Sequence, residues 1–307
     1  MLDIFLKTLP FFALIGIGYG AAASRFFPAE EVAWLTKFVF YFALSAMLVR
    51  FPATLPIEAI TNVDFMLAYL LASIGVYGLV TAVAYARRTG AAEAAIEAQC
   101  GTIGNVGFLA IPMLVSLLGE QVVAPILMVL VVDLIFFGTL IVVILSAPGG
   151  RLSPAIVLTI GRGLIQNPMI VSMSLGLVWS ASGLPLPGPV DDFLVLLGAA
   201  ATPCALFAIG ASLAGKSAER LSVALWLSTA KLVIHPLAVA GVALFLFDLD
   251  PFMTGVMIMT AAMPVAGNVY ILAQHYDVAP QRASSSILAS TVLSIVTLSI
   301  VVGLFAS

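Results

Sequence analysis

Charged side chains are scarce in this sequence: only 9% of its 307 residues are Asp, Glu, Lys or Arg, whereas 62% are hydrophobic. A soluble domain normally has about 25% charged residues, so 12 basic and 15 acidic side chains are too few to cover a water-soluble globule of this size. The formal net charge of −3 also argues against nucleic-acid binding, which depends on clustered basic residues. We therefore expect an integral membrane protein surrounded by lipid.

Cysteine and histidine are equally rare. The two cysteines, Cys100 and Cys204, both lie in apolar stretches, and the sequence has only two histidines. These residues provide neither a disulfide framework nor a metal-ligand spacing. No nucleotide-binding motif is present, so ATP is not expected to drive the protein directly. We expect no metal and no cofactor.

Long apolar runs dominate what remains. A membrane-spanning helix needs roughly 20 apolar residues, and the runs here are continuous, without the two-residue alternation of a β-barrel strand. Ten segments qualify, at about 3–24, 32–51, 64–86, 95–118, 121–146, 163–181, 190–214, 219–247, 252–275 and 283–306. The sequence therefore predicts an all-α membrane protein with ten transmembrane helices.

The charges in the connections predict an orientation. The basic residues in or beside the connections after odd-numbered helices are Arg25, Lys37, Arg87, Arg88, Arg151, Arg162, Lys216, Arg220 and Arg282. The connections after even-numbered helices carry acids instead, namely Glu58, Glu120, Asp191, Asp192, Asp248 and Asp250, and Arg50 is the one basic residue near them. Since positive charge collects on the cytoplasmic side, both termini are expected on the extracytoplasmic side.

The sequence also matches itself. Residues 104–110 read GNVGFLA and residues 267–273 read GNVYILA, with five of the seven positions identical. Each copy lies in the fourth helix of a five-helix half, residues 1–146 and 155–307. Because each half has an odd number of spans, the two halves enter the membrane from opposite sides, as in transporters built from inverted repeats.

Helix breakers accompany each copy: Pro112 follows Asn105, and Pro264 precedes Asn268. Broken helices at membrane depth are tolerated where protein or a watery cavity satisfies the freed backbone, and matched interruptions in two halves indicate a transporter's midplane site. The start of a half-helix offers unpaired N–H groups that suit a carboxylate, and an asparagine amide adds a donor and an acceptor. We expect the site at these two breaks.

Three ionisable side chains lie deep in predicted spans: Asp133 in the fifth helix, and Lys231 and His235 in the eighth. Each costs at least about 2.5–3.5 kcal/mol to insert, so each needs a partner or a cavity. They could relay a proton, or Lys231 or His235 could neutralise a substrate carboxylate, or the residues could form a structural pair between helices. Residues alone leave these three roles open.

The repeat also resembles a known family. Residues 104–112, GNVGFLAIP, are similar to the helix-4 signature of the auxin efflux carrier family, whose bacterial members include malonate-type permeases. Met263-Pro264, Asn167-Pro168 and Thr202-Pro203-Cys204 resemble other parts of that family. The resemblance extends over essentially the whole chain.

The resemblance implies the fold of sodium/bile acid symporters, in which helices 1, 2, 6 and 7 form a scaffold and helices 3–5 and 8–10 form a transport domain. Broken helices 4 and 9 then cross beside the substrate. By this resemblance Asn105 and Asn268 contact substrate and Pro112 and Pro264 are the crossover prolines. The expected substrate-site set is completed by Gly104, Gly107, Phe108, Tyr270 and Asp133. A homodimer formed through the scaffold, in a bacterial inner membrane, is also implied.

Together these features predict a secondary transporter that moves a small organic anion, such as a malonate-like or auxin-like carboxylate, by elevator-type alternating access. Coupling to protons and drive by the membrane potential both remain open. The predicted ninth helix lacks the acid of a sodium site, which makes a sodium-coupled symporter the weaker hypothesis. Competing hypotheses from different functional classes are a channel, a receptor with a Schiff base on Lys231, and an intramembrane enzyme that uses Asp133, Lys231 and His235.

Overall fold

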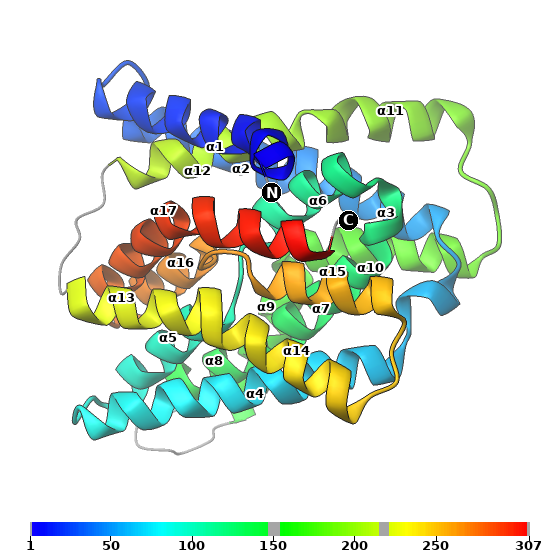
Figure 1. Ribbon diagram of the computed structural model, residues 1–307. Helices are drawn as coiled ribbons and strands as arrows, with labels where there is room; N and C mark the ends of the chain where they lie inside the picture. Colours follow the sequence, from blue (N-terminus) through cyan, green and yellow to red (C-terminus); the bar gives the residue numbers. More distant parts are fainter. Residues whose placement is uncertain (1, 147–153, 215–220, 306–307) are drawn as a thin grey trace.

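The computed structural model describes residues 2–146, 154–214 and 221–305. Every element in these three stretches is helical, and the one isolated β-bridge found in them joins Gly104 and Val265. Figure 1 shows the helices stacked side by side, many of them running along one common direction. The all-α prediction is confirmed.

The first half of the chain contains eight α-helices and five short 3₁₀ or π segments (η). In order they are α1 (Leu2–Ala23), α2 (Ala29–Phe38), η1 (Val39–Ala43), α3 (Leu44–Thr54), η2 (Ile57–Ile60), α4 (Val63–Ala86), α5 (Ala91–Thr102), η3 (Val106–Ala110), α6 (Ile111–Leu118), η4 (Glu120–Val122), α7 (Val123–Val131), η5 (Val132–Phe137) and α8 (Gly138–Ser146).

The described part of the second half contains nine α-helices and one π segment. They are α9 (Pro154–Gln166), α10 (Pro168–Ala181), α11 (Gly188–Ala199), α12 (Ala201–Leu213), α13 (Leu221–Thr229), η7 (Ala230–Ile234), α14 (His235–Leu246), α15 (Pro251–Ala261), α16 (Gly267–His275) and α17 (Pro280–Phe305).

Several of these elements join into helices that are long and apolar enough to cross a membrane. Among the described residues six continuous helices meet that test, and a seventh span results if the bent pair α9–α10 is counted as one. Shorter apolar helices occur at Leu9–Ala23, Val106–Leu118 and Pro251–Ala261, within the first, fourth and ninth predicted spans. The structure therefore supports a multi-spanning membrane protein, while the count of ten spans stays a prediction.

The sixth predicted span, residues 163–181, differs from the structure. The chain bends by 72° between Leu158–Gln166 and Pro168–Ala181, so the predicted segment contains the end of one helix and the whole of another. The bend falls at Asn167, because a residue that precedes proline avoids the helical conformation. The side chain of Asn167 caps the new helix by accepting a hydrogen bond from Met169 N.

The helices pack in two groups. One group consists of α1, α2, α3, α10, α11 and α12, which contact one another extensively. The other consists of α4, α5, α7, α8 and α13–α17. In Figure 1 members of the first group, α1, α2, α12 and α11, lie along the top of the view, and α4, α13 and α14 of the second lie below them. The boundary between the groups passes close to η3, which contacts α12.

Ion pairs join helix ends within and between these groups. Arg282, at the start of α17, pairs with Glu93 and Glu97 of α5, and Glu97 also pairs with Arg87 at the end of α4. Arg50 of α3 pairs with Glu120 of η4 and with Asp191 of α11. The basic residues Arg151, Lys216 and Arg220, which entered the predicted orientation, lie outside the described residues.

Two glycines allow α1 and α12 to approach each other closely. A Cβ atom on Gly210 of α12 would lie 1.8 Å from the carbonyl oxygen of Ile15, and one on Gly18 of α1 would lie 2.1 Å from that of Phe207. Backbone lies against backbone on both sides, as is usual where small residues face each other between membrane helices. A side chain at either position would push the two helices apart.

Gly210→Ala is therefore expected to lower the free energy of unfolding by about 1–3 kcal/mol, the usual cost of overpacking. The control is Gly20→Ala in α1, where an added Cβ meets nothing within 4 Å and the helix gains propensity. Thermal unfolding in detergent measures both variants. An unchanged midpoint for Gly210→Ala would contradict the close packing of α1 and α12.

Candidate functional site

The fourth and ninth predicted spans are both broken, and their breaks lie against each other. The first break separates α5 from η3 and the second separates α15 from α16. Asn105 N donates to Pro264 O at 2.8 Å, and Ala266 N donates to Ile103 O at 3.1 Å, around an antiparallel bridge between Gly104 and Val265. Each unwound segment thus satisfies backbone groups of the other, as unwound backbone away from water requires.

Side chains from two neighbouring elements complete the hydrogen bonding of the second break. Ser290 Oγ of α17 accepts a hydrogen bond from Val265 N at 3.1 Å. Lys231 Nζ of η7 donates to Ala261 O, the last carbonyl of α15. We call this paired region, residues 103–105 with 264–266, the crossing. Besides its own backbone hydrogen bonds, it is stabilised by the Ser290 hydroxyl and the Lys231 ammonium group.

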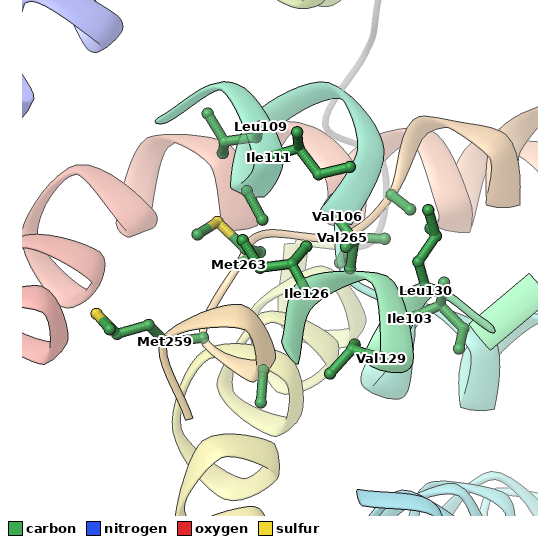
Figure 2. Close-up of a cluster of buried hydrophobic side chains, with 14 of the residues drawn as sticks. Ile103, Val106, Leu109, Ile111, Ile126, Val129, Leu130, Met259, Met263 and Val265 are labelled. Atoms are coloured by element: carbon green, nitrogen blue, oxygen red, sulfur yellow. The ribbon is translucent and has the colours of Figure 1, made fainter. Parts of the chain in front are cut away.

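Hydrophobic side chains surround the crossing. Figure 2 shows Ile103 from the first break and Met263 and Val265 from the second beside Ile126 and Val129 of α7. All five are buried and belong to one hydrophobic cluster. Hydrogen bonds and charges near the crossing therefore act in a medium with little water, where they are stronger than at a surface.

The two asparagines of the repeat stand at the crossing, each at the start of a helical segment. Asn105 precedes η3, which continues into α6, and the residue is only 8% exposed. Asn268 is the second residue of α16 and is exposed, and a Cβ added to its neighbour Gly267 would meet nothing within 4 Å. Among the described residues no hydrogen bond of either side-chain amide is found. The crossing therefore has two unpartnered amides, and open space adjoins the one on Asn268.

The other predicted site residues lie on different sides of these asparagines. A Cβ on Gly104 would come within 3.2 Å of Lys231 Nζ, so Gly104 faces the second helix group. A Cβ on Gly107 would lie 2.5 Å from Met169 Cε of α10, so Gly107 faces the first group. Phe108 is half-buried and stacks on Phe40 of η1, with ring centroids 6.0 Å apart. Gly107 and Phe108 thus lie at the boundary between the groups.

Tyr270 is half-buried in α16, two residues beyond Asn268. Of the two predicted crossover prolines, only Pro264 lies in a break, where its carbonyl accepts the hydrogen bond from Asn105. Pro112 is buried in the first turn of α6, directly after η3. Because η3 and α6 form one continuous helix, Val106–Leu118, Pro112 lies inside it, after the π turn of η3, and the chain unwinds earlier, at Gly104.

A group of buried polar side chains adjoins the crossing. We call this group the polar cluster; it consists of Tyr69, Ser73, Asp133, Lys231 and His235. Asp133 Oδ1 accepts a hydrogen bond from Tyr69 Oη at 2.9 Å, whereas Asp133 Oδ2 is buried and has no partner among the described residues. Lys231 Nζ lies 3.1 Å from His235 Nδ1, and His235 Nε2 lies 2.9 Å from Ser73 Oγ. The structure thus brings all three predicted ionisable residues to one place.

The contacts of the polar cluster define its proton arrangement. An ammonium group carries donors only, so with Lys231 charged, His235 Nδ1 accepts and its Nε2–H donates to Ser73. His235 is then neutral. Lys231 is within electrostatic range of Asp133, although their side chains form no ion pair within 4.0 Å.

Local backbone geometry places the two charges. Asp133 lies in η5 and Lys231 in η7, both π-helical segments. A π turn widens the helix and redirects its side chains, and such turns are frequent at functional sites. η7 directly precedes His235-Pro236, where the proline interrupts the ordinary hydrogen-bond ladder.

Comparisons with known proteins identify the family of the chain. The family described as "Membrane transport protein" matches residues 3–302. A protein from Rhizobium meliloti (strain 1021) described as "Putative malonate transporter" is 32% identical over 301 residues, which cover 97% of this chain and 94% of that protein. The chain therefore belongs to this membrane transport family, the auxin efflux carrier family that its helix-4 motif resembles.

Proposed function

We propose that the protein is a secondary transporter that carries a small organic anion across the membrane, binding it at the crossing of the two broken spans. The observation that carries this proposal is the position of Asn105 and Asn268: both amides are unpartnered among the described residues and stand where the two unwound segments pair. Membership of a membrane transport family supports transport as the function.

The chemistry of the crossing favours a carboxylate. The first turn of a helix has unpaired N–H groups and a partial positive charge, which attract anions. The asparagine amides add donors without a permanent charge, so the site can release its ligand as a carrier must. Among small carboxylates malonate is the first to test, because a relative bears that substrate in its description; an auxin-like acid is the second.

The two helix groups suggest how the site moves. We propose that α1–α3 and α10–α12 form the scaffold, whereas α4–α8 and α13–α17 form a transport domain that shifts against it like an elevator. Gly107 and Phe108 lie at the boundary between these groups, close to the crossing. In this proposal the halves 1–146 and 155–307 are inverted repeats with ten spans in total. We also propose that the protein forms a homodimer through the scaffold, lies in the inner membrane and has both termini on the extracytoplasmic side.

The driving force is proposed to be either a proton or the membrane potential. A sodium-coupled symporter is the weaker candidate, because α16 contains no acidic side chain that could bind the cation.

Transport of labelled carboxylates into proteoliposomes tests this function. We expect saturable uptake of malonate or of an auxin-like acid, accelerated when the same compound is preloaded inside, because a carrier returns faster when loaded. Protein-free liposomes are the control. Uptake that rises linearly with concentration and shows no counterflow would indicate a channel, and the absence of uptake for the whole panel would contradict an organic-anion carrier.

A further inference from the structure

We propose that the polar cluster is a proton-binding site, and that one proton on Asp133 travels with each organic anion. The inference rests on the proposed transport function and identifies its coupling ion. It follows from three observations: Asp133 Oδ2 has no partner among the described residues, the Lys231 ammonium group lies nearby, and that ammonium group also contacts the crossing.

The carboxylate of Asp133 has room for a proton. The side chain is only 5% exposed, Oδ1 has a hydrogen bond from Tyr69, and Oδ2 has no partner among the described residues. A buried carboxylate oxygen without a donor is costly, and binding a proton there removes the charge that causes the cost. In the proposed step a proton from water on one side forms an O–H bond at Oδ2, and the same bond breaks when the proton leaves on the other side.

The charge of the cluster changes with that step. With Asp133 ionised, Lys231 protonated and His235 neutral, the polar cluster has no net charge. Once Asp133 is protonated, the cluster carries one net positive charge. Since the surroundings are apolar and buried, that charge acts strongly on a nearby anion.

Lys231 places this charge beside the crossing where we propose that the anion binds. Its Nζ donates to Ala261 O at the end of α15, and a Cβ on Gly104 would lie 3.2 Å from it. The ammonium group therefore lies against both breaks, next to the residue that precedes Asn105 and at the end of the helix before the second break. Protonation of Asp133 should strengthen anion binding there, and by linkage the bound anion should strengthen proton binding by the same factor.

No other group near Asp133 is as well placed to bind the transported proton. From α4 this aspartate faces Tyr69 and from η7 Lys231, and the ring of Tyr69 lies beside the imidazole of His235 in α14. The α5 helix contributes Gln99, whose amide donates to Phe137 O at the end of η5. The buried acid of α5, Glu97, is already paired with two arginines. Asp133 is therefore the carboxylate free to change its protonation.

The test uses the purified full chain in proteoliposomes, with labelled malonate and the auxin-like acid as probes and the membrane potential clamped to zero by potassium and valinomycin. With the outside one pH unit more acidic, coupling to one proton predicts accumulation of about tenfold over the external concentration. A pH dye inside the vesicles should report acidification when substrate is added outside. A protonophore should abolish the accumulation.

The variant Asp133→Asn has a permanent positive charge in the polar cluster, so its counterflow should no longer respond to the pH gradient. It should lose accumulation and substrate-dependent acidification. Asp133→Glu should restore both, and Asp192→Asn, the same change at an acid outside the polar cluster, should behave like the parent.

Three outcomes would overturn the inference. Accumulation by Asp133→Asn at the parental level would remove Asp133 from coupling. Counterflow by the parent without a response to the pH gradient and without acidification would exclude proton coupling while leaving the transport function intact, whether or not the variant folds. Absence of counterflow by the parent would instead overturn the transport function itself, and this inference with it.

Discussion

Saturable malonate flux is expected to fall by at least about tenfold when Asn268 is replaced with alanine. A hydrogen bond to a charged group contributes about 1.5–3 kcal/mol, and about 1.4 kcal/mol corresponds to a tenfold change in affinity. The Asn268 amide is exposed and lies beside open space, so its loss should remove a ligand contact and leave packing unchanged. Initial rates in proteoliposomes over a range of substrate concentrations measure the effect.

The matched variants separate binding from folding. Asn105→Ala should also lower flux, whereas Asn268→Asp should lower it further, because the new side chain has the same shape but repels an anion. Gln121→Ala, which removes an exposed amide just before α7, should leave flux unchanged. Flux close to the parental value in both asparagine-to-alanine variants would place the anion elsewhere.

Lys231→Met is expected to lower the free energy of unfolding by about 3–5 kcal/mol, the usual cost of removing one member of a set of buried interacting charges. Methionine fits the apolar part of the space, but it leaves Ala261 O and His235 Nδ1 without their donor. It also leaves Asp133 without a compensating charge in a buried setting. Equilibrium unfolding in mixed micelles measures the change.

A double variant tests the cause of that loss. Lys231→Met combined with Asp133→Asn should recover part of the lost stability, because no uncompensated charge then remains in the polar cluster. The control is Lys37→Met, where the lysine is exposed and lies over the ring of Trp34, and it should change stability by less than about 1 kcal/mol. A double variant less stable than Lys231→Met alone would contradict the electrostatic link between Asp133 and Lys231.

The broken spans illustrate what the sequence can predict. The repeated GNV motif and Pro264 identified both unwound segments, and the structure pairs them through backbone hydrogen bonds. The motif was informative because glycine and proline weaken a helix locally, whatever surrounds it. Pro112 did not mark a break: it lies inside the continuous helix Val106–Leu118, directly after the π turn of η3.

Residues that act through distant partners could not be predicted. Tyr69 and Ser73 lie one turn apart in an apolar helix, and only the packing of α4 against η5 and α14 reveals that they hold Asp133 and His235. Ser290 belongs to a line of hydroxyls in α17 that mostly bond to their own helix, yet its oxygen also accepts a hydrogen bond from Val265 N. Periodicity shows which face a residue occupies but not which helix lies opposite.

The most direct measurement is the rate at which a water-soluble maleimide labels a cysteine placed at Gly267. A Cβ there meets open space beside Asn268, and Cys204→Ala removes the native cysteine that is not buried. If the anion occupies the crossing, saturating malonate or the transported analogue should slow labelling of Gly267→Cys several-fold and leave labelling of the exposed Ser182→Cys unchanged. Equal labelling rates with and without a compound that the protein demonstrably transports would show that the anion binds away from the crossing.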